Sequence, residues 1–214
     1  MPLLGLSALR KAGTRASSVI RDLREGIGTV LASPWLWITI AIAALGNVTL
    51  SGPISVALPF LIKDNLRLDV AALGLLQSMF SVGSVAGAVW LGRSAKLRRR
   101  GPIAYGAWMV GGLMTLAFGL PISIVAIALA ALINGVSFSF FGLIWTNTLQ
   151  ELVPREVLGR VSSIDYFGSF VLLPVGYGVA GWATEQFGAP AMFVVGGALT
   201  AALGLAHPAI RHLD

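Results

Sequence analysis

Long apolar runs dominate the chain, and charged residues gather in short segments between them. The runs cover about residues 35–62, 70–91, 103–119, 122–149, 161–184 and 191–209. Each run reaches or exceeds the roughly 17–25 residues that a transmembrane helix needs. We therefore predict an all-α membrane protein whose six transmembrane helices form one bundle over residues 34–210.

Two breaks in the helical pattern are expected inside these runs. Residues 103–150 contain no charged side chain, and the stretch is too long for one crossing, so we place a turn at Gly119–Pro121. Gly52–Pro53 lies inside the first run. Because proline removes a backbone hydrogen bond, we expect it to kink or break that helix.

Residues 1–33 are the longest polar stretch, and they are basic. Ile20, Leu23 and Ile27 recur there at helical spacing, with charged residues off the stripe. We predict an amphipathic helix, which lies either on the cytoplasmic membrane surface or against the rest of the protein.

Basic residues mark one side of the predicted bundle. Segments 1–33, 92–102, 150–160 and 211–214 hold thirteen of the fifteen Lys and Arg residues, and an even number of crossings puts all four on one side. Since cytoplasmic loops carry the excess of Lys and Arg, we expect a plasma-membrane protein with both termini in the cytoplasm. The most basic loop contains Gly92, Arg93, Arg98, Arg99 and Arg100.

Composition narrows the function. The chain is 56% hydrophobic and 11% charged, whereas soluble domains are about one-quarter charged. The net charge of +6 follows from the basic loops, so we expect no nucleic-acid partner. No paired carboxylates, nucleophile with a base or phosphate loop is present, and His207 and His212 match no metal-binding spacing. We predict no enzyme, no metal and no cofactor.

The polar residues of the spans follow a pattern that repeats after three spans. The first and fourth spans carry amides and hydroxyls, the second and fifth are rich in small residues, and the third and sixth are almost wholly apolar. Because three is odd, the second triplet crosses in the opposite sense, as in the inverted repeats of many transporters. We expect the polar spans to face water or substrate, the small-rich spans another helical body, and the apolar spans lipid.

Two polar spans supply candidates for a substrate cavity. Helical spacing puts Asn47 and Ser51 on one face of the first span. The corresponding face of the fourth span carries Asn134, Phe138, Phe141 and Trp145. An aromatic wall with a few amides suits a bulky lipophilic substrate. The alternative is ordinary bundle packing, in which the amides bridge helices.

Glycines and one acid complete the candidates. Gly83 and Gly87 have the GxxxG spacing of closely packed helices, and we assign Gly176 and Gly178 the same packing role. Asp165 is an acid inside an apolar run, where a charge is costly. It is a candidate for proton coupling. The alternative, which we favour, is an acid near the interface that pairs with a nearby arginine or caps neighbouring amides.

Three segments resemble the major facilitator superfamily. Residues 22–26 and 34–37 resemble the central cytoplasmic loop and the start of its seventh helix. Residues 153–163 resemble the loop before the eleventh helix, and residues 92–101 resemble the second Gly-x-Leu-Ala-Asp-Arg-x-Gly-Arg-Arg loop. Ser94 and Lys96 depart from that motif, so we expect the loop to set topology and not to act as a charge relay.

The resemblance implies the C-terminal six-helix half of such a transporter, in the drug-efflux and enterobactin-exporter-like branch. It implies export of a small lipophilic compound by proton antiport, through rocking of two bundles about a midplane site. The implied partners are membrane lipid, the substrate and a second six-helix bundle, which is a separate N-terminal half or a second copy. The alternative is an inactive truncated fragment or a membrane interaction module.

Overall fold

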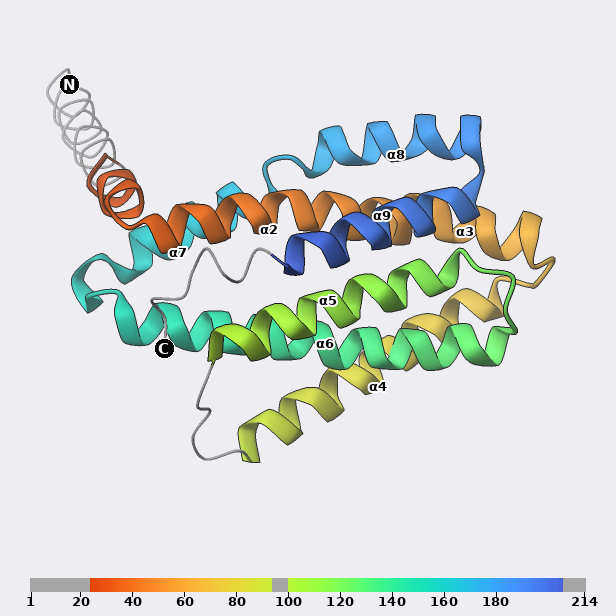
Figure 1. Ribbon diagram of the computed structural model, residues 1–214, viewed down its shortest axis with the longest axis horizontal. Coiled ribbons are helices and arrows are strands. Elements are labelled where there is room, and N and C mark those ends of the chain that lie inside the picture. The colour runs from red at the N-terminus through yellow and green to blue at the C-terminus, as the bar shows by residue number, and fades with distance from the viewer. Residues whose placement is uncertain (1–23, 94–99, 206–214) are drawn as a thin grey trace, which may run out of the picture.

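The computed structural model describes residues 24–93 and 100–205, and this part of the chain is helical with short connections. Residues 24–32 form a helix that leads into the bundle. The elements that follow are α2 (Pro34–Gly52), η1 (Pro53–Ala57), α3 (Leu58–Phe60), η2 (Leu61–Asn65), α4 (Ala71–Arg93), α5 (Arg100–Phe118), α6 (Ile124–Leu152), α7 (Arg155–Phe170), α8 (Leu173–Phe187) and α9 (Ala189–Gly204). Successive passes alternate in direction along the long axis of the bundle (Figure 1).

Five helical segments of the described chain are long and apolar enough to cross a membrane. They cover Pro34–Asn65, Ala71–Arg93, Arg100–Phe118, Ile124–Leu152 and Arg155–Phe187. The sixth predicted span contains α9, a shorter apolar helix of 16 residues. The multi-helix membrane architecture is therefore present, while the sixth crossing stays a prediction because residues 206–209 lie outside the described chain.

Prolines change the winding inside two of these segments. At Pro53 the first segment continues, but it passes from α-helix to π-helix over Pro53–Ala57, where the wider turn accommodates a proline ring that has no N–H to donate. The fifth segment is interrupted between α7 and α8, where Pro174 stands in the first turn of α8. We did not predict this interruption, although a helix tends to end before a proline.

The predicted basic loop at residues 92–102 is shorter than expected, because helices extend into it from both ends. Gly92 and Arg93 close α4, and Arg100 opens α5. Arg98 and Arg99 lie outside the described residues, as do residues 1–23, the 211–214 tail, His207 and His212.

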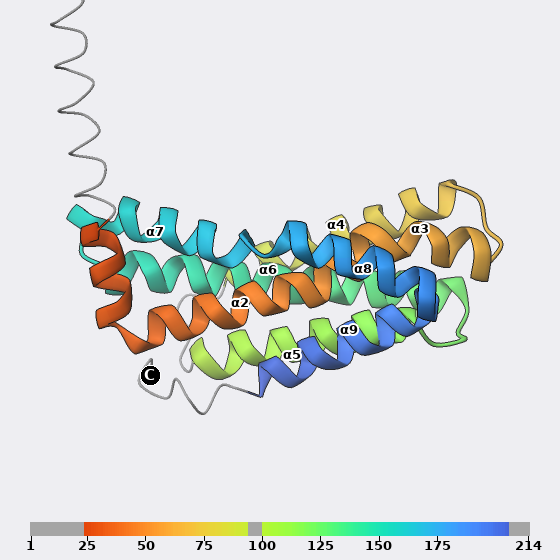
Figure 2. The ribbon, with the colours of Figure 1, turned by 90° about the horizontal axis from the view of Figure 1, so that it is seen from above.

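Two ion pairs bring three of the basic segments together at one end of the bundle. Arg100 at the start of α5 pairs with Glu151 at the end of α6. Arg160 on α7 pairs with Glu25 of the N-terminal helix, with 2.5 Å between Nη1 and Oε2. This end is where residues 24–33 enter and where α4, α5, α6 and α7 start or finish (Figures 1 and 2). The predicted grouping of these segments is therefore confirmed for the residues described.

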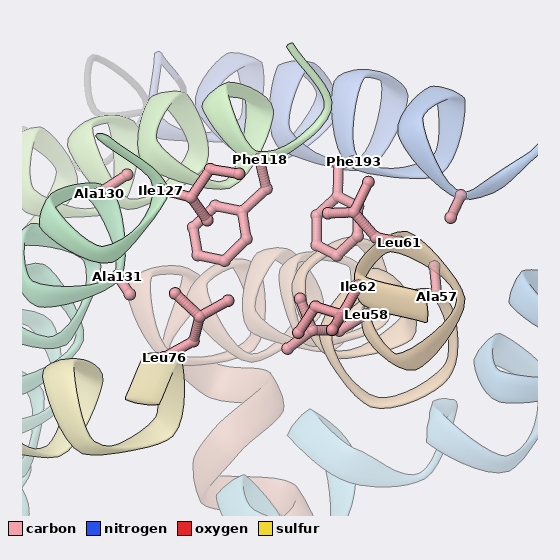
Figure 3. Packing of buried hydrophobic residues seen from close by; sticks show 11 residues of the cluster. Ala57, Leu58, Leu61, Ile62, Leu76, Phe118, Ile127, Ala130, Ala131 and Phe193 are labelled. Atoms are coloured by element: carbon pink, nitrogen blue, oxygen red, sulfur yellow. The ribbon is translucent and has the colours of Figure 1, made fainter. Parts of the chain in front are cut away.

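The opposite end of the bundle is closed by a hydrophobic core. Residues from α3, η2, α4, α5, α6 and α9 meet there, and the Phe118 and Phe193 rings stack with centroids 5.5 Å apart (Figure 3). Leu76 and Ile127 are almost fully buried against them. Such packing excludes water from this end of the bundle.

Glycine contacts define the closest helix pairs. A Cβ added at Gly83 would collide with the Leu132 carbonyl, and one at Gly87 would lie 3.0 Å from Val136, so both glycines of α4 pack against α6. A Cβ added at Gly176 of α8 would lie 2.8 Å from a methyl group of Val48 on α2. A Cβ added at Gly178 would meet nothing within 4 Å, because residues two apart point to different sides of a helix and Gly178 faces away from α2. Its predicted packing role therefore stays a prediction.

The two apolar spans that we expected to face lipid pack closely on each other. Gly112 of α5 and Gly197 of α9 each leave no room for a Cβ against the backbone of the other helix. Thr115 and Thr200, on the same two helices, are fully buried. Each of these two helices therefore has a face that packs on protein, and its apolar composition does not show which face this is.

Candidate functional site

A cavity of about 260 Å³ lies between α2, α5, α6 and α7. Its lining is mainly apolar and aromatic, with a few amides and hydroxyls. Five of the predicted residues line it: Asn47, Asn134, Phe138, Phe141 and Trp145. The proton-coupling candidate Asp165 lines it as well, and within residues 24–93 and 100–205 it is the only charged residue in the lining.

One predicted residue falls outside the cavity. The lining stripe of α2 consists of Ala43, Gly46, Asn47 and Leu50, and Ser51 does not belong to it. Leu50 occupies the end of the stripe, because the helix rotates by about 100° for each residue. Within this cavity Leu50 therefore stands where Ser51 was expected, and a role of Ser51 in substrate binding stays a prediction.

The two amides bridge helices. Asn47 Nδ2 on α2 donates to the Ser169 carbonyl oxygen on α7, at 2.9 Å. Asn134 Nδ2 on α6 donates to the Gly111 carbonyl oxygen at 3.0 Å and to Thr115 Oγ1 at 2.8 Å, both on α5. An amide nitrogen carries two N–H groups, so Asn134 has no further N–H to offer a ligand. The alternative interpretation of the amides, helix bridging, is the one that these bonds favour.

Aromatic side chains form the wall that the spacing predicted. Phe141 meets the Trp108 ring edge-on, with centroids 4.1 Å apart. Trp145 contacts Trp35 edge-on at 6.0 Å, and Phe138 tilts against Phe80 at 5.7 Å. Because these contacts fix the rings in place, the wall is largely formed before any ligand arrives.

Trp108 on α5 is a cavity residue that the sequence analysis missed. Its ring lies over Gly46, where an added Cβ would collide with Cζ2, and it lines the cavity. Its span was predicted to face lipid because nearly all of its residues are apolar. The available signal was the indole N–H, one of the few polar groups in this largely apolar helix.

Asp165 on α7 is held by an aromatic donor. Trp145 Nε1 donates to its Oδ2 at 3.0 Å. The nearby Arg160 pairs with Glu25. Asp165 therefore lies in the cavity wall beside Trp145. Both interpretations of this acid, as a proton carrier and as an acid near the interface that pairs with an arginine or caps amides, stay predictions.

Two buried polar atoms in this wall make no hydrogen bond within the described residues: Asp165 Oδ1 and Trp108 Nε1. One is an acceptor and the other a donor. A buried polar atom without a partner is costly, and it commonly marks a place where a ligand or water binds.

The residues of the cavity are suited to binding a ligand. No group of three or more His, Asp or Glu residues is placed to hold a metal within residues 24–93 and 100–205. What the cavity provides is an apolar, aromatic surface with one carboxylate and a few hydrogen-bonding groups, suited to a compound that is mostly hydrophobic.

Several apolar helices of membrane-spanning length place the chain among multi-pass membrane proteins. The chain belongs to the Major Facilitator Superfamily, because the model of that family matches residues 9–213. Members of this family are transporters, which agrees with the prediction that the chain is not an enzyme.

Two curated relatives match the chain at 23% identity over 209 residues. They are macrolide efflux protein A of Streptococcus pyogenes and the same protein of Streptococcus pyogenes serotype M6 (strain ATCC BAA-946 / MGAS10394). The match covers 95% of this chain and 51% of each relative, so the chain spans about half the length of the curated relatives it matches. No solved structure matches the chain.

Proposed function

We propose that this chain is the C-terminal six-helix half of a secondary transporter that exports a small lipophilic compound across the plasma membrane. The observation that carries the proposal is the aromatic cavity between α2, α5, α6 and α7. Its volume of about 260 Å³ lies just below the roughly 300–1,000 Å³ of complete ligand pockets. This fits a half-site whose other wall comes from a second bundle. The relatives' printed name, macrolide efflux protein, supports export as the direction of transport.

The helix contacts support the inverted 3+3 repeat. α2 packs on α7 and α8 as α6 packs on α4, so the first span meets the fifth as the fourth meets the second. α5 packs on both α6 and α9, while α9 also packs on α2. Exchanging the two triplets maps these contacts onto one another, whereas the smaller α8–α9 and α6–α7 contacts have no counterpart of similar extent. A pseudo-two-fold axis in the membrane plane has this effect.

The second bundle would cover the small-rich spans. Val82, Val85 and Val89 form an exposed stripe on α4, and Val175, Val179 and Trp182 form one on α8. The inner side of α4 packs against α6 through Gly83 and Gly87. The outer stripes are free for a separate N-terminal half or a second copy of this chain. Where no protein covers them, they face lipid.

The mechanism we propose is rocking of the two bundles about the cavity. The charged end of this bundle would face the cytoplasm, because it carries the basic segments. The hydrophobic core around Phe118 and Phe193 would seal the opposite end while the cavity is open inward. Proton antiport would drive the cycle, with Asp165 as the candidate proton carrier.

The test is drug accumulation in efflux-deficient bacteria that express the chain, with a panel of lipophilic compounds that includes a macrolide. We expect lower accumulation than in empty cells, and a partial loss of this effect in Phe138→Ala, because Phe138 lines the cavity. The matched control is Val125→Ala, which changes an exposed residue of the same helix outside the lining. Equal accumulation in expressing and empty cells would reject transport by this chain and leave an interaction module or inactive fragment.

A further inference from the structure

We propose that the cavity selects lipophilic amines that also carry an oxygen acceptor, with Asp165 binding the ammonium group and Trp108 donating to the oxygen. This inference rests on the proposed transport function and names its substrate class. It starts from two buried polar atoms of the cavity wall, Asp165 Oδ1 and Trp108 Nε1, which have no hydrogen-bond partner within the described chain.

The carboxylate has no cation beside it in the lining. Among the described residues, Asp165 is the only charged one that lines the cavity, and the side chains that hydrogen-bond to it there, Trp145 and Ser169, are neutral. A carboxylate in a membrane-spanning segment is costly unless it is paired or solvated. A ligand ammonium would supply the missing positive charge and a hydrogen bond to Oδ1 at once.

The indole of Trp108 is fixed in position with its N–H unused. Phe141 packs edge-on against the ring, and Gly46 lies directly beneath it. Since a tryptophan N–H only donates, its partner must be an acceptor such as an ether, carbonyl or hydroxyl oxygen. Asp165 therefore requires a hydrogen-bond donor in the ligand, and Trp108 requires an acceptor in the same ligand.

The remaining lining sets the ligand's hydrophobic character. Phe138, Phe141 and Trp145 present aromatic surface, which also favours a cation close to a ring face. Neighbouring protein atoms cover Asp165 Oδ1 and Trp108 Nε1. Binding therefore includes a rotation of the Asp165 carboxyl group about its soft terminal torsion, together with small movements of the side chains around Trp108.

Diphenhydramine is a suitable probe because it carries a tertiary amine, an ether oxygen and two phenyl rings. Two isosteres remove one feature each: an isopropyl group in place of dimethylamino, and a methylene in place of the ether oxygen. Equilibrium binding of all three is measured on the purified full chain in nanodiscs, at a pH where the amine is protonated.

For the wild-type chain we expect the amine to bind about tenfold or more tightly than its isopropyl isostere, since a hydrogen bond to a charged group is worth this much. In Asp165→Asn this preference should disappear while binding of the isopropyl compound stays within about twofold, and Asp165→Glu should restore part of it. In Trp108→Phe we expect the ether compound to lose several-fold in affinity and the methylene compound to change little.

Equal binding of the amine and the isopropyl isostere to wild type would overturn the inference, and this comparison needs no variant to fold. An equal loss of both compounds in Asp165→Asn would also overturn it, because it would assign Asp165 a structural role. Binding with the expected selectivity but no efflux from cells would reject the proposed transport and keep the ligand class. Efflux without a preference for amines would support the proposed transport and reject the proposed ligand class.

Discussion

At the scale of single residues, the polar positions were predictable and their partners were not. Asn47 and Asn134 stand out because amides are rare in apolar spans. Their partners are backbone carbonyls and a hydroxyl on helices that are distant in sequence. Helical spacing gives the face on which a residue lies but not the helix that it meets, so cavity lining and helix bridging could not be separated from sequence.

Asn134 is therefore expected to contribute to stability. Asn134→Leu removes hydrogen bonds to Gly111 and Thr115 on α5, and interhelical hydrogen bonds in membranes are worth roughly 0.6–2 kcal/mol. We expect the free energy of unfolding to fall by about 1–2 kcal/mol, measured by denaturation in mixed micelles. Leu129→Ala, an exposed position on the same helix, is the control. An unchanged stability with altered drug selectivity would instead make Asn134 a ligand contact.

At the scale of helices, the first four predicted spans lie close to helical segments, because an apolar run ends where charged residues begin. The fifth is interrupted and the sixth crossing stays a prediction. The predicted first span, 35–62, corresponds to Pro34–Asn65, and the second, 70–91, to Ala71–Arg93. The π-helical winding after Pro53 and the interruption before Pro174 were not predictable. A proline indicates that the helix is irregular at that position, but the surrounding packing determines whether the helix widens, bends or ends there.

The α5–α9 contact provides a test at this scale. A Cβ at Gly197 would collide with the backbone of Leu116 and Gly112, and neither can shift without moving a helix. We expect Gly197→Ala to destabilise the bundle by about 1–3 kcal/mol, seen as a lower melting temperature in detergent.

Gly178→Ala is the matched control, because its Cβ would meet nothing within 4 Å. Alanine is the better helix former by about 1 kcal/mol, so this variant should be neutral or slightly more stable. If both alanine variants melted alike, close packing of α5 on α9 would not be a feature of the protein.

At the scale of the whole molecule, the distribution of charge organises the bundle. The Arg100–Glu151 and Arg160–Glu25 pairs gather three basic segments at one end, while the core around Phe118 and Phe193 closes the other. The count of basic residues predicted this grouping from sequence. Which end faces the cytoplasm follows only from the general bias of membrane proteins, since nothing within a helical bundle marks the side of the membrane.

Sidedness can be measured directly because the chain contains no cysteine. Glu156→Cys places a thiol in the first turn of α7, at the end with the ion pairs, and Asp69→Cys places one at the opposite end, between η2 and α4. Both positions are exposed. A membrane-impermeant maleimide added to intact cells should label Asp69→Cys and leave Glu156→Cys unlabelled until the membrane is permeabilised. The reverse labelling pattern would show the opposite orientation in the membrane, in which the core around Phe118 and Phe193 lies on the cytoplasmic side.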